Sequence, residues 1–259
     1  MIQKLFGSAL ALIRLFFLVI TMAIFTGFGL ILVYTRIFKQ NHAFQIRTFW
    51  CKLACIILGI KIYKTGHLDL SKTQLYIGNH RSLIDPVIVF SFITNGYAVS
   101  KSEVENYPLI SQGAKLSGVI FVHRTKAESR TEAKNAILEF LNKNYSILIF
   151  PEGTISTTRE LLPFKKGSIE SAVAANKQIS SFALEYMNPK KDFWWNENLI
   201  RQFILTFSKW KTEVRIHFFD PEYASDPVAF TAKIKDRIQS KINDFQTHWK
   251  DENLPDLLR

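Results

Sequence analysis

Cysteine is scarce in this chain of 259 residues, where it occurs only at positions 51 and 55. The i,i+4 spacing would place Cys51 and Cys55 on one face of a helix, with their side chains too nearly parallel to form a disulfide comfortably. We therefore predict no disulfide framework, and the soluble part of the protein fits a reducing compartment. The six histidines also lack metal-ligand spacing such as His-x-x-x-His, so no zinc site is predicted.

Acidic residues are missing from the start of the chain, where the first one is Asp69. Residues 1–65 nevertheless carry eight basic residues, and the remainder is close to balanced, with 25 basic and 22 acidic residues. A solvated face or a nucleic-acid site is the ordinary interpretation of such a basic excess. Here the basic residues are interleaved with long apolar runs, which favours an anionic membrane surface and argues against a nucleic-acid partner.

Residues 15–33 contain no charged side chain. A helix of this length spans about 28 Å, close to the hydrocarbon core of about 30 Å, and is about twice as long as the apolar part of a cleaved signal peptide. A second apolar segment at 50–62 contains Lys52 and Lys61 and is too short to span, so we expect it at the membrane interface. Residues 1–65 are therefore predicted to be an N-terminal membrane anchor. A re-entrant hairpin in one leaflet and one span followed by a surface helix fit equally well.

From residue 66 onward, short apolar runs alternate with helical patterns, which predicts an α/β domain over residues 66–259 with a mixed sheet flanked by helices. Strands are expected at 74–78, 97–100, 119–123, 146–150, 179–186 and 213–219, and helices near 83–93, 106–117, 126–144 and 165–176. A last helix is expected from Pro227 to about residue 249 with Asp226 as its N-cap, and Thr125 with Glu128 forms a capping box. Residues 187–212 carry three tryptophans among basic residues and are expected to be irregular, either at a membrane interface or packed under a loop.

His80 and Asp85 follow one predicted strand and open the next helix. An aspartate there could reach back to one imidazole nitrogen and fix the tautomer, which leaves the other nitrogen to take a proton from a substrate hydroxyl. The alternative is structural, because Ser82 followed three residues later by Asp85 resembles a capping box. The chain has no Gly-x-Ser-x-Gly turn and no cysteine near His80 in sequence. The pair would therefore catalyse direct attack of a hydroxyl on an acyl thioester, without an acyl-enzyme.

Two further strand ends carry polar residues. The run Phe150-Pro151-Glu152-Gly153-Thr154 follows an apolar strand, and its glycine would let backbone amides approach a ligand closely. The strand from Gly118 ends near Arg124, whose guanidinium could clamp a phosphate bidentately. A strand-end turn with solvated charges is the structural alternative for both, and for the basic run that contains Lys165 and Lys166.

In their order, these blocks resemble the glycerolipid acyltransferase family, specifically the lysophosphatidic acid acyltransferases. The resemblance covers roughly residues 74–186 and rests on Asn79-His80 to Asp85, Gly118 to Arg124 and Phe150 to Thr154, with Lys101-Ser102-Glu103 and the Leu-Pro-Phe-Lys-Lys-Gly run at similar spacing. It implies that His80 is the general base and Asp85 its orienting partner. It also implies that the substrates contact the other residues of these blocks, namely Asn79, Lys101, Gly118, Arg124, Glu152, Gly153, Thr154, Lys165 and Lys166. Since Glu152 cannot itself favour a phosphate dianion, we interpret it as holding a hydroxyl, Arg124 or the loop.

The reaction implied by the resemblance is transfer of an acyl chain from acyl-CoA or acyl-carrier protein to 1-acylglycerol-3-phosphate in the membrane, with a cytoplasmic catalytic domain and with no cofactor besides the co-substrate. Two departures from the family pattern put the acceptor's identity in doubt. Ile155 stands where an arginine is usual, so that the next arginine is Arg159, and the strand at 179–186 has no proline. Another lyso-lipid, such as lyso-ornithine lipid, is the alternative acceptor. A lipid-cleaving esterase would need a nucleophile that the sequence does not provide, and a non-catalytic membrane tether would have no reason to keep both His80 and Asp85.

Overall fold

A seven-stranded mixed sheet forms the centre of the computed structural model, which describes residues 2–34, 40–101, 108–122, 127–195 and 198–250. The strand order is β1-β7-β6-β2-β5-β3-β4. Strands β6, β2, β5, β3 and β4 are parallel to one another, whereas β7 is antiparallel to β6 and parallel to β1. The strands are β1 (Ile60–Gly66), β2 (Gln74–Gly78), β3 (Tyr97–Lys101), β4 (Val119–Val122), β5 (Ile147–Ile149), β6 (Gln178–Tyr186) and β7 (Thr212–Phe218).

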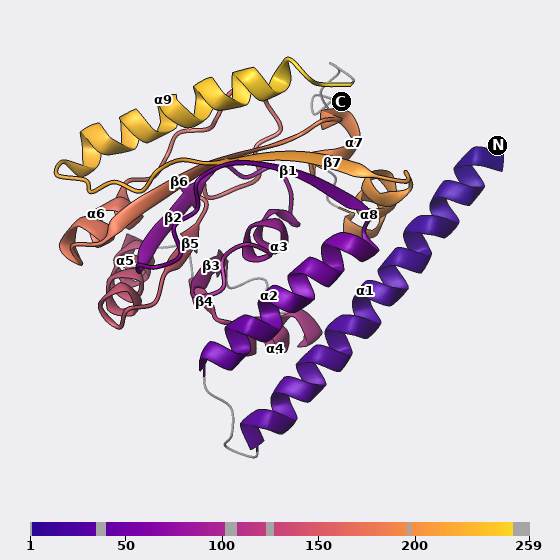
Figure 1. Ribbon diagram of the computed structural model, residues 1–259, viewed down its shortest axis with the longest axis horizontal. Helices are drawn as coiled ribbons and strands as arrows, with labels where there is room; N and C mark the ends of the chain where they lie inside the picture. Colours follow the sequence, from indigo (N-terminus) through magenta and orange to yellow (C-terminus); the bar gives the residue numbers. More distant parts are fainter. Residues whose placement is uncertain (1, 35–39, 102–107, 123–126, 196–197, 251–259) are drawn as a thin grey trace.

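Helices cover both faces of this sheet (Figure 1). In that view α9 (Pro227–Gln246) lies above the sheet, and α1 (Ile2–Tyr34), α2 (Gln40–Ile57) and α4 (Pro108–Ser117) lie below it. The remaining helices are α3 (Asp85–Phe90), α5 (Ala127–Asn142), α6 (Gly167–Ala174), α7 (Pro189–Asp192) and α8 (Leu199–Phe207). Successive residues of β2 point to opposite faces, so Leu75 and Ile77 pack with α5, α6 and α9 while Tyr76 packs with α2, α3 and α8. Two hydrophobic cores therefore enclose the sheet.

The predicted α/β architecture with a mixed sheet is confirmed. All six expected strands are present to within two residues, and α9 begins where its capping signal predicts, because Asp226 Oδ1 accepts a hydrogen bond from the N–H of Val228 at 2.8 Å. The Thr125 capping box lies outside the described residues. Cys51 and Cys55 are both buried free thiols on α2.

The sequence predicts one interfacial segment at 50–62. The structure instead has the end of α2 followed by the start of β1 there. Gly59 has a φ of +65°, a left-handed conformation that ends the helix and turns the chain. Strand β1 then pairs with β7 along its whole length, from Ile60 with Thr212 to Gly66 with Phe218. The expected boundary after residue 65 therefore cuts through a strand of the sheet.

The region 187–212 is also more regular than expected. Asn188 and Asn198 are N-caps whose side chains accept hydrogen bonds from the N–H groups of Lys191 and Arg201, and they open the short helices α7 and α8. Helix α8 buries Phe203 and Phe207 on one face. The sequence signal for these two helices is an asparagine N-cap before Pro189 and another before Leu199. The aromatic and basic composition of the region does not reveal it.

Helix α1 is longer than the uncharged segment at 15–33, because Arg14 does not break it. The guanidinium of Arg14 is buried and donates hydrogen bonds to the carbonyls of Phe207, Lys209 and Trp210 at the end of α8, at 2.7–2.9 Å. In α2, Arg47 donates in the same way to the carbonyl of Gly96, in the turn before β3, and to the carbonyl of Ser117, at the end of α4. Both basic residues thus neutralise carbonyl ends in the domain rather than facing lipid headgroups.

Candidate active site

Parallel pairing of β2 and β5 brings two of the predicted sequence blocks to the same edge of the sheet. Ile77 is the register partner of Ile149, so His80 and Glu152 each follow three residues beyond paired positions. The backbone N–H of His80 donates to Glu152 Oε1 at 2.9 Å, and the N–H of Ser156 donates to the His80 carbonyl at 2.8 Å. The carboxyl ends of the strands therefore hold His80 by its own backbone, in the region where open α/β sheets bind ligands.

The imidazole of His80 is paired with Asp85. Its Nδ1 lies 2.8 Å from Asp85 Oδ2, and the ring stacks on Phe150 with a centroid distance of 4.2 Å and an interplanar angle of 15°. The His80 side chain is 14% exposed and the Asp85 side chain is 0% exposed, so the imidazole reaches solvent while its carboxylate partner is buried. A buried carboxylate on Nδ1 selects the tautomer in which Nε2 can accept a proton, which is the arrangement of a general base.

Asp85 also holds the turn before α3. Its Oδ2 accepts the backbone N–H groups of Arg81 at 2.6 Å and Ser82 at 2.8 Å. Asp85 is the first residue of the helix, and the N-cap position, Ile84, makes no side-chain cap. The orienting and the structural interpretations of the sequence therefore hold together, since the same oxygen serves both.

Both carboxylate oxygens of Glu152 hold loops at the site. Its Oε1 accepts from His80 and its Oε2 accepts from the N–H of Leu162, also at 2.9 Å. Burial raises the pKa of the Glu152 carboxyl, although these N–H donors and the Arg81 and His80 charges oppose the rise. Of the roles considered from sequence, the loop-holding role is the one the geometry supports, and the substrate-contact role implied by the resemblance stays a prediction.

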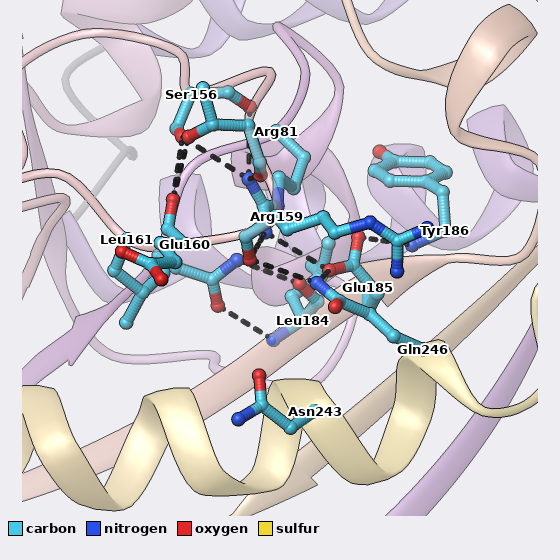
Figure 2. A network of polar contacts seen from close by, with 12 residues as sticks. Arg81, Ser156, Arg159, Glu160, Leu161, Leu184, Glu185, Tyr186, Asn243 and Gln246 are labelled. Atoms are coloured by element: carbon cyan, nitrogen blue, oxygen red, sulfur yellow. Dashed lines mark hydrogen bonds and ion pairs between the residues drawn. The ribbon is translucent and has the colours of Figure 1, made fainter. Parts of the chain in front are cut away.

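Arg81 forms the centre of a buried network behind the His80 turn (Figure 2). Its side chain is fully buried and forms an ion pair with Glu185 at 3.0 Å, in which burial raises the pKa of the Glu185 carboxyl and the Arg81 charge opposes that rise. Arg81 also donates to the carbonyl of Thr158 at 2.7 Å, and Gln246 of α9 donates to Glu185 and to the carbonyl of Arg159. The loop that follows Glu152 is thereby fastened to β6 and α9.

Comparison with known proteins decides the family. The family model described as Acyltransferase matches residues 59–185. Residues 59–185, about half of the chain, therefore form an acyltransferase-family domain. It is 31% identical over 129 residues to the lyso-ornithine lipid O-acyltransferase of Rhizobium meliloti, covering 50% of this chain and 44% of that protein. It is 37% identical over 125 residues to the 1-acyl-sn-glycerol-3-phosphate acyltransferase of Limnanthes douglasii, covering 48% of this chain and 44% of that protein.

The 1-acyl-sn-glycerol-3-phosphate acyltransferase of Borreliella burgdorferi is 31% identical over 140 residues, covering 53% of this chain and 56% of that protein. The alignments thus span about half the length of these relatives. The crystal structure of the 1-acyl-sn-glycerophosphate (LPA) acyltransferase PlsC from Thermotoga maritima superimposes with a TM-score of 0.78, covering 96% of this chain and 100% of that chain at 17% identity. This structural similarity extends the shared fold beyond the family match, to α1, α2 and α9.

Two residues that the family resemblance assigned to substrate contact have structural roles instead. Asn79 is 0% exposed, and its amide exchanges two hydrogen bonds with the backbone of Leu184 in β6, at 2.7 and 2.8 Å. Gly118 lies at the amino end of β4, at the opposite edge of the sheet from His80, with a φ of +88°. A Cβ there would approach the ring of Phe44 to 2.6 Å, so the glycine allows α2 to pack on the sheet.

The remaining predicted residues lie around the edge that carries His80. Gly153 has a φ of +75° and donates its N–H to the carbonyl of Phe150, which makes the turn in which Thr154 is exposed. The N–H of Lys165 donates to the carbonyl of Pro151, so the basic run lies beside this turn. The ammonium of Lys166 pairs with Glu170 of α6 at 3.3 Å.

The other basic candidates are Arg159, Lys101 and Arg124. Arg159 stacks on the ring of Trp249 at 4.8 Å. Lys101 ends β3, paired in register with Val122. Arg124 lies outside the described residues, and its phosphate role stays a prediction. No three His, Cys, Asp or Glu side chains within the described part of the chain are close enough to form a metal site.

Sequence analysis missed Glu185 and Tyr186, which end β6 next to the His80 turn. The Tyr186 hydroxyl donates to Asp85 Oδ1 at 2.7 Å. The available signal was the same as for His80, namely polar residues at the carboxyl end of an apolar strand. That signal could not show which turn the Tyr186 side chain reaches, because its partner Asp85 lies 101 residues earlier in the sequence.

Proposed function

We propose that this protein is a membrane-bound O-acyltransferase that moves a fatty acyl chain from a thioester donor to the free hydroxyl of 1-acylglycerol-3-phosphate. The observation that carries this proposal is the His80–Asp85 pair at 2.8 Å, placed at the ligand-binding edge of an acyltransferase-family domain. The relatives named for this acceptor support the choice of substrate.

The chemistry follows from the pair. His80 Nε2 takes the proton of the acceptor hydroxyl while that oxygen attacks the thioester carbonyl, and the buried Asp85 carboxylate stabilises the imidazolium that forms. Collapse of the tetrahedral intermediate breaks the C–S bond, and the imidazolium returns its proton to the leaving thiolate. The products are the acylated lipid and the free thiol of the donor.

An acyl-enzyme on cysteine is disfavoured by the environment of the two thiols. Cys51 and Cys55 lie inside α2, and burial raises the pKa of each to about 12. Thiols with such pKa values remain protonated at neutral pH and are poor nucleophiles. Direct transfer between the two substrates is the mechanism that needs no further group.

Membrane attachment is proposed from α1. The stretch Leu5–Leu32 is long and apolar enough to cross a membrane, and little of it is buried in the domain. Yet Arg14 binds the end of α8, and Gly29 lies close to Leu116 of α4, so the helix contacts the domain near both of its ends. A helix packed lengthwise on the domain supports a hairpin with one face in a single leaflet rather than a separate span. We further propose that the catalytic domain faces the cytoplasm.

The proposal is tested with purified protein, labelled acyl-CoA or acyl-carrier protein as donor, and a panel of lyso-lipid acceptors. We expect transfer to 1-acylglycerol-3-phosphate, and we expect His80→Ala to abolish it while membrane binding is kept. Arg124→Ala should raise KM for that acceptor by about one to two decades, because a charge-assisted hydrogen bond contributes about 1.5–3 kcal/mol. An acceptor without the phosphate should be affected much less.

Lyso-ornithine lipid is the second candidate acceptor, because a relative named for it matches at 31% identity and Ile155 departs from the phosphate-acceptor pattern. Ile155→Arg provides the matching variant. If the enzyme uses the phosphate acceptor, this substitution should leave the rate of transfer to that acceptor unchanged or increase it. Transfer to lyso-ornithine lipid with none to the phosphate acceptor would overturn the first choice.

A further inference from the structure

Tyr186 approaches the catalytic pair from β6, a strand that carries none of the site residues predicted from the sequence. It is the last residue of β6, which pairs with β2, and it is 1% exposed. Its hydroxyl donates to Asp85 Oδ1 at 2.7 Å, whereas His80, Arg81 and Ser82 all use Oδ2. Within the described residues, Tyr186 is thus the one donor on the far oxygen of the carboxylate.

The charges around this hydroxyl keep it a donor. Burial first, and then the negative charge of Asp85, raise the pKa of Tyr186 well above its usual value. Asp192 acts in the same direction, and a hydrogen bond with the Ser82 side chain opposes the rise. The other ionisable groups at the turn are Glu152, on the backbone of His80, and the Arg81–Glu185 ion pair. Tyr186 therefore stays protonated at neutral pH, so its hydroxyl remains a donor.

We propose that Tyr186 is a positioning residue of the His80–Asp85 pair, whose hydroxyl fixes the plane of the carboxylate and draws part of its charge away from Oδ2. This rests on the proposed function only for the role given to His80. Three donors already hold Oδ2, and the donor on Oδ1 adds a further restraint on rotation of the carboxylate about its Cβ–Cγ bond. Withdrawal of charge also limits how strongly Asp85 holds a proton on His80, which must release that proton to the leaving thiolate.

Tyr186→Phe tests the proposal, because it removes one hydroxyl and keeps the buried ring. Tyr76→Phe is the matched control: Tyr76 is also 1% exposed, in the neighbouring strand β2, and its hydroxyl bonds the carbonyl of Asp69 away from the pair. The first measurement is an NMR titration of the imidazole nitrogens in the full chain in detergent micelles, with His80→Ala to assign the signal. We expect Tyr186→Phe to raise the His80 pKa by about half a unit to one unit, because the carboxylate charge is then concentrated at Oδ2.

The second measurement is the pH dependence of acyl transfer. In Tyr186→Phe the acidic limb of kcat/KM should move to higher pH by the same amount as the titration. The value of kcat should fall about tenfold, while KM stays unchanged because the buried hydroxyl touches no substrate. Tyr76→Phe should leave the limb and kcat as in the wild type.

An unchanged His80 pKa in Tyr186→Phe, or an equal shift in Tyr76→Phe, overturns the proposal, as does a loss of thermal stability with no movement of the limb. The titration needs no substrate. If the wild-type protein acylates no lyso-lipid, the proposed function fails while the titration still decides the role of Tyr186.

Discussion

Asp85→Asn separates the two roles of this carboxylate, because the change removes the charge and keeps the shape. The wild-type group accepts hydrogen bonds from His80, from the N–H groups of Arg81 and Ser82, and from Tyr186. An asparagine oxygen can take the place of Oδ2, and the Tyr186 hydroxyl can rotate to accept from the amide group. We therefore expect the turn to persist and the free energy of unfolding to change by about 1 kcal/mol or less.

The catalytic loss should be much larger, because the imidazolium loses its counter-charge. A hydrogen bond to a charged group contributes about 1.5–3 kcal/mol, which corresponds to about 10- to 150-fold in rate. With the asparagine oxygen at the Oδ2 position, the NH₂ group lies away from Nδ1, so the tautomer is kept and the loss is that of the counter-charge. The value of kcat should therefore fall by about one to two decades.

The assay is the initial rate of transfer at saturating donor and acceptor, with denaturant unfolding measured in the same detergent. Asp226→Ala is the control for a carboxylate that only caps a helix, since Asp226 opens α9 far from His80 in sequence. That variant should lose about 1 kcal/mol of stability and keep its kcat. If Asp85→Asn behaves like Asp226→Ala, with wild-type kcat and reduced stability, then Asp85 only holds the turn and the catalytic assignment is wrong.

Two further substitutions test the supports of the site. Glu152→Gln leaves one oxygen for the N–H groups of His80 and Leu162, so stability should fall by about 1–3 kcal/mol in denaturant unfolding. Because burial raises the pKa of Glu152, the folded protein binds that proton more tightly than the unfolded chain does. This difference makes the unfolding free energy decrease as pH rises above the usual glutamate range. The variant should lose this part of the pH dependence of stability. Arg47→Met removes the donors to the carbonyls of α4 and the turn before β3 and should cost about 2–3 kcal/mol, whereas Lys52→Met, on the exposed side of α2, should change stability by about 0.5 kcal/mol or less.

Much of the fold could be predicted because its central strands are continuous apolar runs between turn signals. Strand β1 could not, since its sequence, Ile-Lys-Ile-Tyr-Lys-Thr-Gly, continues the apolar and basic pattern of the preceding helix. Its partner β7 lies about 150 residues further along the chain, at register pairs such as Ile62 with Val214. A pairing of that range leaves no trace in local periodicity, so the strand was assigned to the membrane segment.

The site shows the same division between local and distant contacts. His80, Asp85 and Glu152 could be found because each stands in a short block at a strand end. Asn79 was misassigned because its partner, Leu184, is 105 residues away, and a buried amide that bonds a neighbouring strand looks in sequence like a ligand contact. Tyr186 was missed for the same reason, since its hydrogen bond to Asp85 spans 101 residues.

The two N-terminal helices pack against the α/β domain and are held to it by buried hydrogen bonds. Arg14 and Arg47 each place a buried guanidinium on carbonyls at the end of a domain helix, and α2 leads through Gly59 directly into a strand of the sheet. Because each guanidinium satisfies two or more otherwise unpaired carbonyls, tilting either helix would expose several buried polar groups at once. Under the proposed membrane placement, the depth of α1 in the leaflet therefore fixes the height of His80 above it. For the proposed reaction, that height has to bring the imidazole to the hydroxyl of a lyso-lipid acceptor at the headgroup level.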